Sequence, residues 1–153
     1  MGLDKRTYKV SLIVDNALDS GARHGLSKVR LALQIRGISF EEIDSLDNAH
    51  SNMLVIIGVN DKSDAISEMV KSSGSQIPDI AESLLIKNIE KDNRKILLVS
   101  GKDDRGLMYA LLDIADRIGW GSDVENPFSE VKDTIEKPEV VERSLSMYTM
   151  SKS

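Results

Sequence analysis

A strand, a turn and a helix follow one another between Lys95 and Trp120, and this stretch constrains the fold more than any other part of the chain. The residues at its start, KILLVS, form a short aliphatic run that is typical of a buried strand. Gly101 ends the run. Asp103 or Asp104 can then cap a helix, because a carboxylate accepts hydrogen bonds from the free N–H groups of the first turn.

The residues after this turn have the spacing of an amphipathic helix. One apolar stripe contains Leu107, Leu111, Ile114, Ala115 and Ile118. Arg117 suits the last turn, where a cation is favoured, and Gly119 is predicted to close the helix in a left-handed conformation. The sequence therefore predicts a strand and a long helix that packs on the sheet to which the strand belongs.

The remaining elements are predicted from the same signals. Strands are expected, in chain order, over residues 8–15, 38–43, 53–59 and 82–89. A second main helix is expected from a cap at Ser20 to Arg36–Gly37, and a short one over residues 64–71, stopped near Gly74. Two weaker extended segments, residues 130–135 and 140–147, flank Pro138.

These elements predict an α+β fold, a mixed sheet with the two main helices packed on it. Residues 53–59, MLVIIGV, are the most hydrophobic run and are expected to be a central strand buried on both faces, while residues 38–43 suit an edge. Asp92–Asn93 favours a tight hairpin between residues 82–89 and 95–100, so at least one pair of strands is antiparallel.

Composition limits the class of function. The chain has 153 residues, enough for one domain with a real core, and 41% of them are hydrophobic. Its net charge of −5 argues against a nucleic-acid partner, because phosphate binding needs clustered Lys and Arg. No apolar run is long enough to span a membrane, so we expect no membrane partner.

Neither a metal nor another cofactor is expected. Cysteine is absent, and the two histidines, His24 and His50, lack the partner one helical turn away that a zinc protease requires. We interpret His24 as a surface or capping residue and His50 as part of a polar loop.

Two glycine-containing segments resemble phosphate sites only superficially. Leu107 and Met108 follow Gly106 where a phosphate loop needs Lys and Ser or Thr, so we interpret residues 101–106 as a turn and a cap. Residues 56–60, IIGVN, stand at the end of a predicted strand. They are interpreted as an ordinary strand end, with a nucleotide pocket as the alternative.

No acidic pair points to catalysis. Glu41 and Glu42 are neighbours on a strand and should point to opposite faces, while Asp113 and Asp116 should lie on the solvated side of their helix. No catalytic residue is therefore predicted.

The strand-turn-helix stretch resembles the N-terminal domains of β-N-acetylhexosaminidases and α-glucuronidases, which precede a catalytic (β/α)8 barrel. The matching residues are Gly101, Asp104, Arg105, Gly106, Leu107 and Tyr109. The resemblance implies a sheet with two main helices, often described as zincin-like without the zinc centre. Arg105 is the first residue to inspect there, and we interpret it as a structural salt-bridge partner of a carboxylate.

The end of the chain resembles the passage from that domain into the barrel. Residues 137–148, KPEVVERSLSMY, place Arg143 where hexosaminidases have a sugar-binding Arg at the first barrel strand, with Ser144 in place of their usual Gly. The resemblance implies an accessory domain over residues 1–136 and a tail over residues 137–153 that leads toward the barrel.

The resemblance thus implies a non-catalytic N-terminal domain of a glycoside hydrolase. Its partners would be the downstream barrel and carbohydrate. The sequence does not determine the location of the parent protein, for which secretion and the periplasm are the candidates. The chain falls short of the about 250 residues that a barrel needs. An autonomous α/β binding or interaction module, with a nucleotide as one candidate ligand, remains the alternative.

Overall fold

The computed structural model describes residues 8–15, 18–123 and 125–138. Its strands are β1 (Val10–Val14), β2 (Phe40–Ile43), β3 (Met53–Val59), β4 (Leu84–Lys91), β5 (Arg94–Gly101) and β6 (Thr134–Glu136). Its α-helices are α1 (Ser20–Ile35), α2 (Asp64–Ser72) and α3 (Asp104–Trp120), with short 3-10 turns η2 (Leu46–Asn48) and η3 (Asn60–Lys62).

The six strands form one mixed sheet in the order β2-β1-β3-β5-β4-β6. The four strands β2, β1, β3 and β5 are parallel, whereas β4 is antiparallel to β5 and β6 is antiparallel to β4. The predicted α+β fold is confirmed. So is the interior position of β3, which lies between β1 and β5 and is buried over nearly its whole length.

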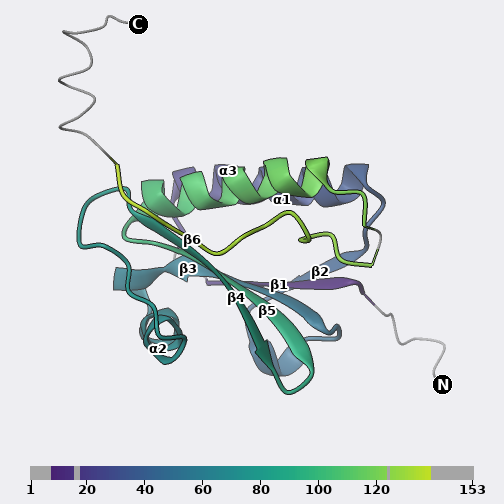
Figure 1. Cartoon of the computed structure of the whole chain (residues 1–153), viewed down its shortest axis with the longest axis horizontal. Helices are drawn as coiled ribbons and strands as arrows, with labels where there is room; N and C mark the ends of the chain where they lie inside the picture. The colour runs from purple at the N-terminus through teal and green to yellow at the C-terminus, as the bar shows by residue number, and fades with distance from the viewer. Residues whose placement is uncertain (1–7, 16–17, 124, 139–153) are drawn as a thin grey trace, which may run out of the picture.

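The helices lie on both faces of the sheet (Figure 1). The two long helices, α1 and α3, run side by side in the same direction on one face, and the short α2 lies on the other. The larger core is formed between the sheet and the long helices, where Leu26 and Leu33 of α1 meet Leu111 and Ile114 of α3. A smaller core under α2 contains Leu54, Ile66 and Leu98.

The hairpin between β4 and β5 is confirmed and has a clear local cause. Asp92 and Asn93 have φ values of 54° and 64°, so both turn residues are left-handed, as in the two-residue turns whose twist matches that of a hairpin. Asp and Asn tolerate this conformation better than most residues do.

Two predicted helix ends differ from the structure. Ser20 is the first residue of α1, and the cap position is occupied by Asp19, whose side chain makes no capping hydrogen bond. Gly119 does not close α3 in a left-handed conformation, because the helix continues to Trp120 and its cap, Gly121, has an extended backbone with φ of −74°. Gly37, with φ of 71°, follows α1 as expected.

The strands toward the end of the chain are shifted or shorter. The strand expected from Glu82 begins at Leu84, because Glu82 itself is left-handed with φ of 69°. Of the segment predicted over residues 130–135, only Thr134 and Ile135 belong to the sheet, in a strand that continues to Glu136. The segment predicted over residues 140–147 lies outside the described residues. None of the described helices could span a membrane.

Candidate functional site

The turn that joins β5 to α3 is held by the carboxylate of Asp103. Its Oδ1 accepts a hydrogen bond from the N–H of Gly106 at 2.9 Å, and its Oδ2 accepts one from the N–H of Glu82 at 3.0 Å. One side chain therefore caps α3 and fixes the segment that leads into β4, because it satisfies N–H groups from both.

Gly101 and Gly106 lie where two segments of the backbone pack closely against each other. A Cβ atom on Gly101 would meet the backbone of Leu107 and Gly106, and one on Gly106 would meet the carbonyl of Ser83. Glycine therefore lets the first turn of α3 lie directly against the ends of β4 and β5.

Asp104 belongs to α3 but caps the other long helix. Its carboxylate accepts hydrogen bonds from the N–H groups of Gly21 at 3.0 Å and Ala22 at 2.8 Å, in the first turn of α1. Asp19, which precedes α1, forms an ion pair with Lys62 at 2.8 Å instead, and the hydrogen bond from Lys62 lowers the pKa of Asp19. Asp104 thus faces the positive ends of two helix dipoles at once.

Arg105 lies at the surface of this turn. Its guanidinium is 3.5 Å from the carboxylate of Glu82, and its side chain is 65% exposed. An exposed pair of this kind contributes little to the free energy of folding. Arg143 lies outside the described residues.

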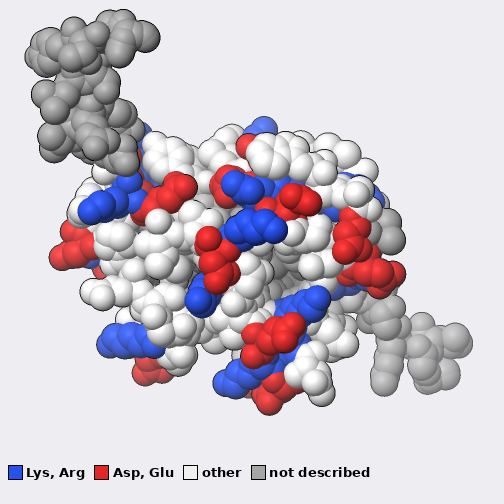
Figure 2. All heavy atoms as spheres, viewed as in Figure 1, with Lys and Arg blue, Asp and Glu red and all other residues white. Residues whose placement is uncertain are grey.

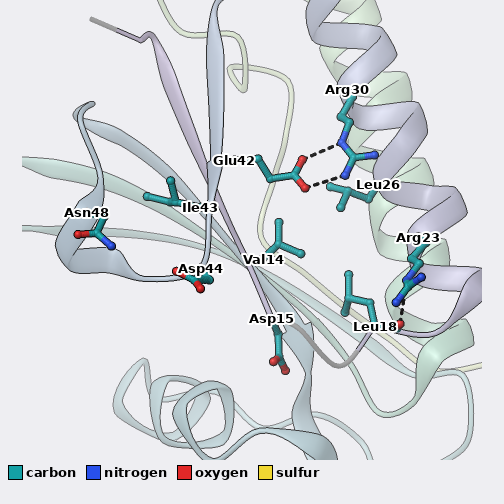
Figure 3. Close-up of a pocket in the computed structure, with 10 residues that line it drawn as sticks. All are labelled: Val14, Asp15, Leu18, Arg23, Leu26, Arg30, Glu42, Ile43, Asp44 and Asn48. Carbon is teal, nitrogen blue, oxygen red and sulfur yellow. Dashed lines mark hydrogen bonds and ion pairs between the residues drawn. The ribbon is translucent and has the colours of Figure 1, made fainter. Parts of the chain in front are cut away.

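A pocket of about 640 Å³ lies beside the carboxyl ends of β1 and β2 (Figure 3). Helix α1 supplies one wall with Arg23, Leu26 and Arg30, and β2 with the turn after it supplies the opposite wall. Asp44 and Asn48 belong to that opposite wall. Parallel strands bring their carboxyl ends to one edge of a sheet, which is where pockets of α/β proteins usually form.

Arg30 and Glu42 join the two walls of this pocket. The Nε and Nη2 atoms of Arg30 each donate to one carboxylate oxygen of Glu42 at 2.7 Å, and this hydrogen bonding raises the pKa of Arg30. The paired geometry holds the edge strand β2 against α1, because two parallel hydrogen bonds fix both distance and orientation.

Glu41 points to the other face of β2, as the alternation of a strand requires. It accepts hydrogen bonds from Ser11 Oγ at 2.5 Å and from the backbone N–H of His50 at 2.6 Å, and His50 Nδ1 lies 2.9 Å from its other oxygen. Burial raises the pKa of Glu41, but these hydrogen bonds outweigh burial and hold it below its ordinary value. This cluster is structural, because Ser11 is fully buried and bonds to the carboxylate rather than to an imidazole.

The described residues offer no group of three His, Cys, Asp or Glu side chains that could hold a metal ion. His24 is exposed on α1, and Gly58, in the segment predicted as a possible nucleotide pocket, belongs to β3. A Cβ on Gly58 would come within 2.6 Å of Ile66, so this glycine makes room for α2 to pack on the sheet.

An apolar groove runs between α1 and α3 on the side away from the sheet. We call it the outer groove; its volume is about 680 Å³ and its lining includes Leu31, Ile35, Leu112 and Trp120. Trp120 is 66% exposed and Ile35 is 75% exposed, whereas the sheet-facing residues of the same helices are almost fully buried. Both long helices therefore present apolar side chains on two opposite sides.

Charged side chains do not gather by sign on the face that Figure 2 shows. Over the described part of that face, Lys and Arg lie among Asp and Glu, and no broad basic area forms there. The expectation of no nucleic-acid partner remains a prediction.

No protein-family model and no curated protein matches the sequence. Two solved structures share the fold at 14% sequence identity; one is a GH138 enzyme targeting pectin rhamnogalacturonan II, and the other is CpGH84D. The first matches 85% of this chain with a TM-score of 0.57, and the second matches 69% with a TM-score of 0.51. The structural neighbours are thus glycoside hydrolase chains, and this chain spans only 15% and 17% of their lengths.

Sequence reasoning missed the pocket, because its signal, an acid at the end of each of two strands, becomes usable only when the direction of the strands is known. Asp15 ends the first predicted strand and Asp44 follows the second, so both acids stand at carboxyl ends of strands. Once β1 and β2 are known to be parallel, these acids must lie at the same edge of the sheet. The Arg30–Glu42 pair had no such signal, because Arg30 lies within a helix and Glu42 within a strand, and their meeting depends on how α1 packs beside β2.

Proposed function

We propose that the chain is a non-catalytic N-terminal accessory domain of a larger glycoside hydrolase. The observation that carries the proposal is that its fold occurs as 15% and 17% of two glycoside hydrolase chains while most of this chain is matched. The resemblance of residues 101–109 to hexosaminidase and α-glucuronidase domains supports it independently. The proposal includes a domain boundary near residue 136 and a sugar-binding role for Arg143 once a barrel is present.

The outer groove is the surface we assign to the barrel. Its apolar side chains, Leu31, Ile35 and Trp120, cost free energy while they face water, and an interface core favours aromatic and aliphatic residues of this kind. The remainder of a much longer chain is the occupant that the comparisons favour, because both neighbours extend far beyond the matched fold.

An autonomous α/β binding module is the second candidate. The pocket beside β1 and β2 favours it, because an accessory domain that only packs on a barrel needs no polar pocket of about 640 Å³ at its sheet edge. The two candidates predict different gene products. The first predicts an open reading frame that continues for about 250 residues of strand-helix repeats, and the second predicts one that ends near Ser153.

Hydroxyl-radical footprinting tests the docking surface directly. The side chain of Trp120, the only tryptophan in the sequence, should be modified readily in the isolated chain and be protected in the full-length gene product. Ile135 serves for comparison, because it is an apolar side chain that is 54% exposed on β6 and does not line the outer groove.

Equal modification of Trp120 in the two proteins would overturn docking through the outer groove. Protection that develops in the isolated chain as its concentration rises, together with a dimer mass, would assign the groove to a second copy instead. A reading frame that stops near Ser153 would overturn the accessory-domain proposal itself, whatever the footprint.

A further inference from the structure

The pocket beside β1 and β2 lies next to the point where the chain leaves β1 and β3 toward opposite faces of the sheet. After β1 the chain enters α1 on one face, and after β3, which pairs with β1, it leads to α2 on the other face (Figure 1). Such a switch point opens a crevice at the carboxyl ends of the strands. A second hollow of about 350 Å³, under α2, shares Val14, Asp15 and Asp44 with the pocket.

The lining of the pocket offers both hydrogen-bond donors and acceptors above an apolar floor. Arg23 and Asn48 can donate, Asp44 and Asn48 can accept, and Leu26 and Ile43 supply apolar surface (Figure 3). The Nε of Arg23 donates to the carbonyl of Leu18 at 3.1 Å, which holds this guanidinium at the wall.

The charges of the pocket nearly cancel. Asp15, Glu42 and Asp44 carry negative charge, Arg23 and Arg30 carry positive charge, and Glu42 is already paired with Arg30. A strongly charged ligand of either sign would meet a group of its own sign, so the lining suits a neutral molecule.

Phosphate is disfavoured for a second reason. The start of α1 borders this pocket, and a helix start commonly binds phosphate through its free N–H groups. Here the N–H groups of Gly21 and Ala22 already donate to Asp104, so a carboxylate of the protein itself occupies that position.

We propose that this pocket binds a neutral polyhydroxylated ligand, a sugar of about one or two rings. Hydroxyl groups both donate and accept, which matches the mixed lining, and the C–H face of a pyranose matches the apolar floor. None of the described residues that line the pocket is aromatic, so the expected affinity is in the millimolar range, about that of a ligand held by a few hydrogen bonds. The inference goes beyond the proposed function, because the pocket is lined by residues of this chain and its ligand would bind whether or not a barrel is attached.

Nuclear magnetic resonance titration of the whole 153-residue chain tests the inference. The probes are glucose, galactose and rhamnose as neutral sugars, with galacturonate and inorganic phosphate as charged comparisons. At least one neutral sugar should give saturable shifts of backbone amides around Val14, Ile43 and Asn48, and phosphate should give none there.

Two variants and one matched control decide whether the pocket is the site. Asp44→Ala and Asn48→Ala should each weaken binding by about fivefold, as the loss of one hydrogen bond does. Asp47→Ala should leave it unchanged, because Asp47 lies exposed in the same turn but does not line the pocket. Spectra away from the pocket report whether each variant is folded.

Three results would overturn the inference. The first is the absence of saturable shifts with all three neutral sugars. The second is equal binding by the wild type and both pocket variants, and the third is tighter binding of phosphate than of any neutral sugar. None of these results bears on the barrel interface, which footprinting of Trp120 tests separately.

Discussion

Asp104 and Arg36 connect the two long helices at opposite ends. Asp104 in α3 accepts from the first turn of α1, and Arg36, just after α1, donates from its Nη1 to the carbonyl of Ile118 near the end of α3 at 3.2 Å. Each helix therefore satisfies terminal backbone groups of the other. This exchange requires the two helices to run in the same direction, because only then do like ends meet.

The first prediction concerns Asp104. Asp104→Ala should lower the free energy of unfolding by about 1–2 kcal/mol, since it removes the cap of α1 and leaves two N–H groups without their carboxylate. Asp104→Asn should recover part of the loss, because an amide oxygen still accepts. Urea denaturation measures both.

Asp116→Ala is the control for this prediction. Asp116 is an exposed acid on the same helix, so its loss changes the net charge equally without removing a cap. If Asp104→Ala costs no more than Asp116→Ala, the hydrogen bonds from Asp104 to α1 contribute nothing measurable.

At the scale of elements, the strand-turn-helix unit could be predicted from sequence because its signals are local. The aliphatic run of β5, the cap Asp103 and the apolar stripe of α3 all lie within residues 95–120. The two misplaced helix ends had a different cause. Ser20 and Gly119 have the right residue types for caps, but α1 takes its cap from Asp104, which is distant in sequence, and α3 continues past Gly119.

The candidate site was less predictable because it also depends on contacts between residues that are distant in sequence. Strand direction decides which side chains share an edge, and local sequence signals determined direction only for the antiparallel hairpin at Asp92–Asn93. The pocket depends instead on the parallel pairing of β1 with β2, and on Arg30 reaching Glu42 across it. Such contacts between elements follow from packing, and no local pattern encodes them.

The second prediction tests how closely α3 approaches the start of β4. Gly106→Val should destabilise the domain by about 1–3 kcal/mol, because its Cβ would meet the carbonyl of Ser83 and a β-branched side chain cannot turn aside. Gly119→Val is the matched control, because it makes the same change in the same helix. Apart from the adjacent residues and the helix backbone, no described atom lies within 4 Å of a Cβ at that position. Thermal unfolding compares the two variants. Equal melting temperatures would show that the backbone at Ser83 can move away from the new side chain without loss of stability.

In the molecule as a whole, the two faces of the helix layer lie in different environments. The inner face forms the main core with the sheet, and the outer groove exposes Ile35 and Trp120. The polar pocket stands apart from that groove, at the strand edge, where Asp44 and Asn48 lie. An interface and a ligand site can therefore coexist without sharing residues, so a variant at one should leave the other intact.

The last prediction is that the chain alone hydrolyses no glycoside. Cleavage requires a general acid and a second carboxylate held across a sugar ring, the acid with a raised pKa. Among the described residues, the pKa values of four acids are shifted downward, which favours the charged form and opposes proton donation; these are Asp19, Glu41, Asp61 and Asp133. In the pocket, Glu42 is held by Arg30 in a paired hydrogen bond, so it is poorly placed to act on a sugar.

Enzyme assays of two proteins test this prediction. A panel of aryl glycosides and glucuronides, assayed with the purified chain and with the full-length gene product, should give turnover only with the latter, because both carboxylates and the rigid cleft that cleavage needs would come from the barrel. Asp44 is the acid to change in the control, since it lines the pocket and lies at the carboxyl edge of the sheet. Turnover by the isolated chain that disappears in Asp44→Ala would place the chemistry in the pocket and overturn the accessory-domain proposal.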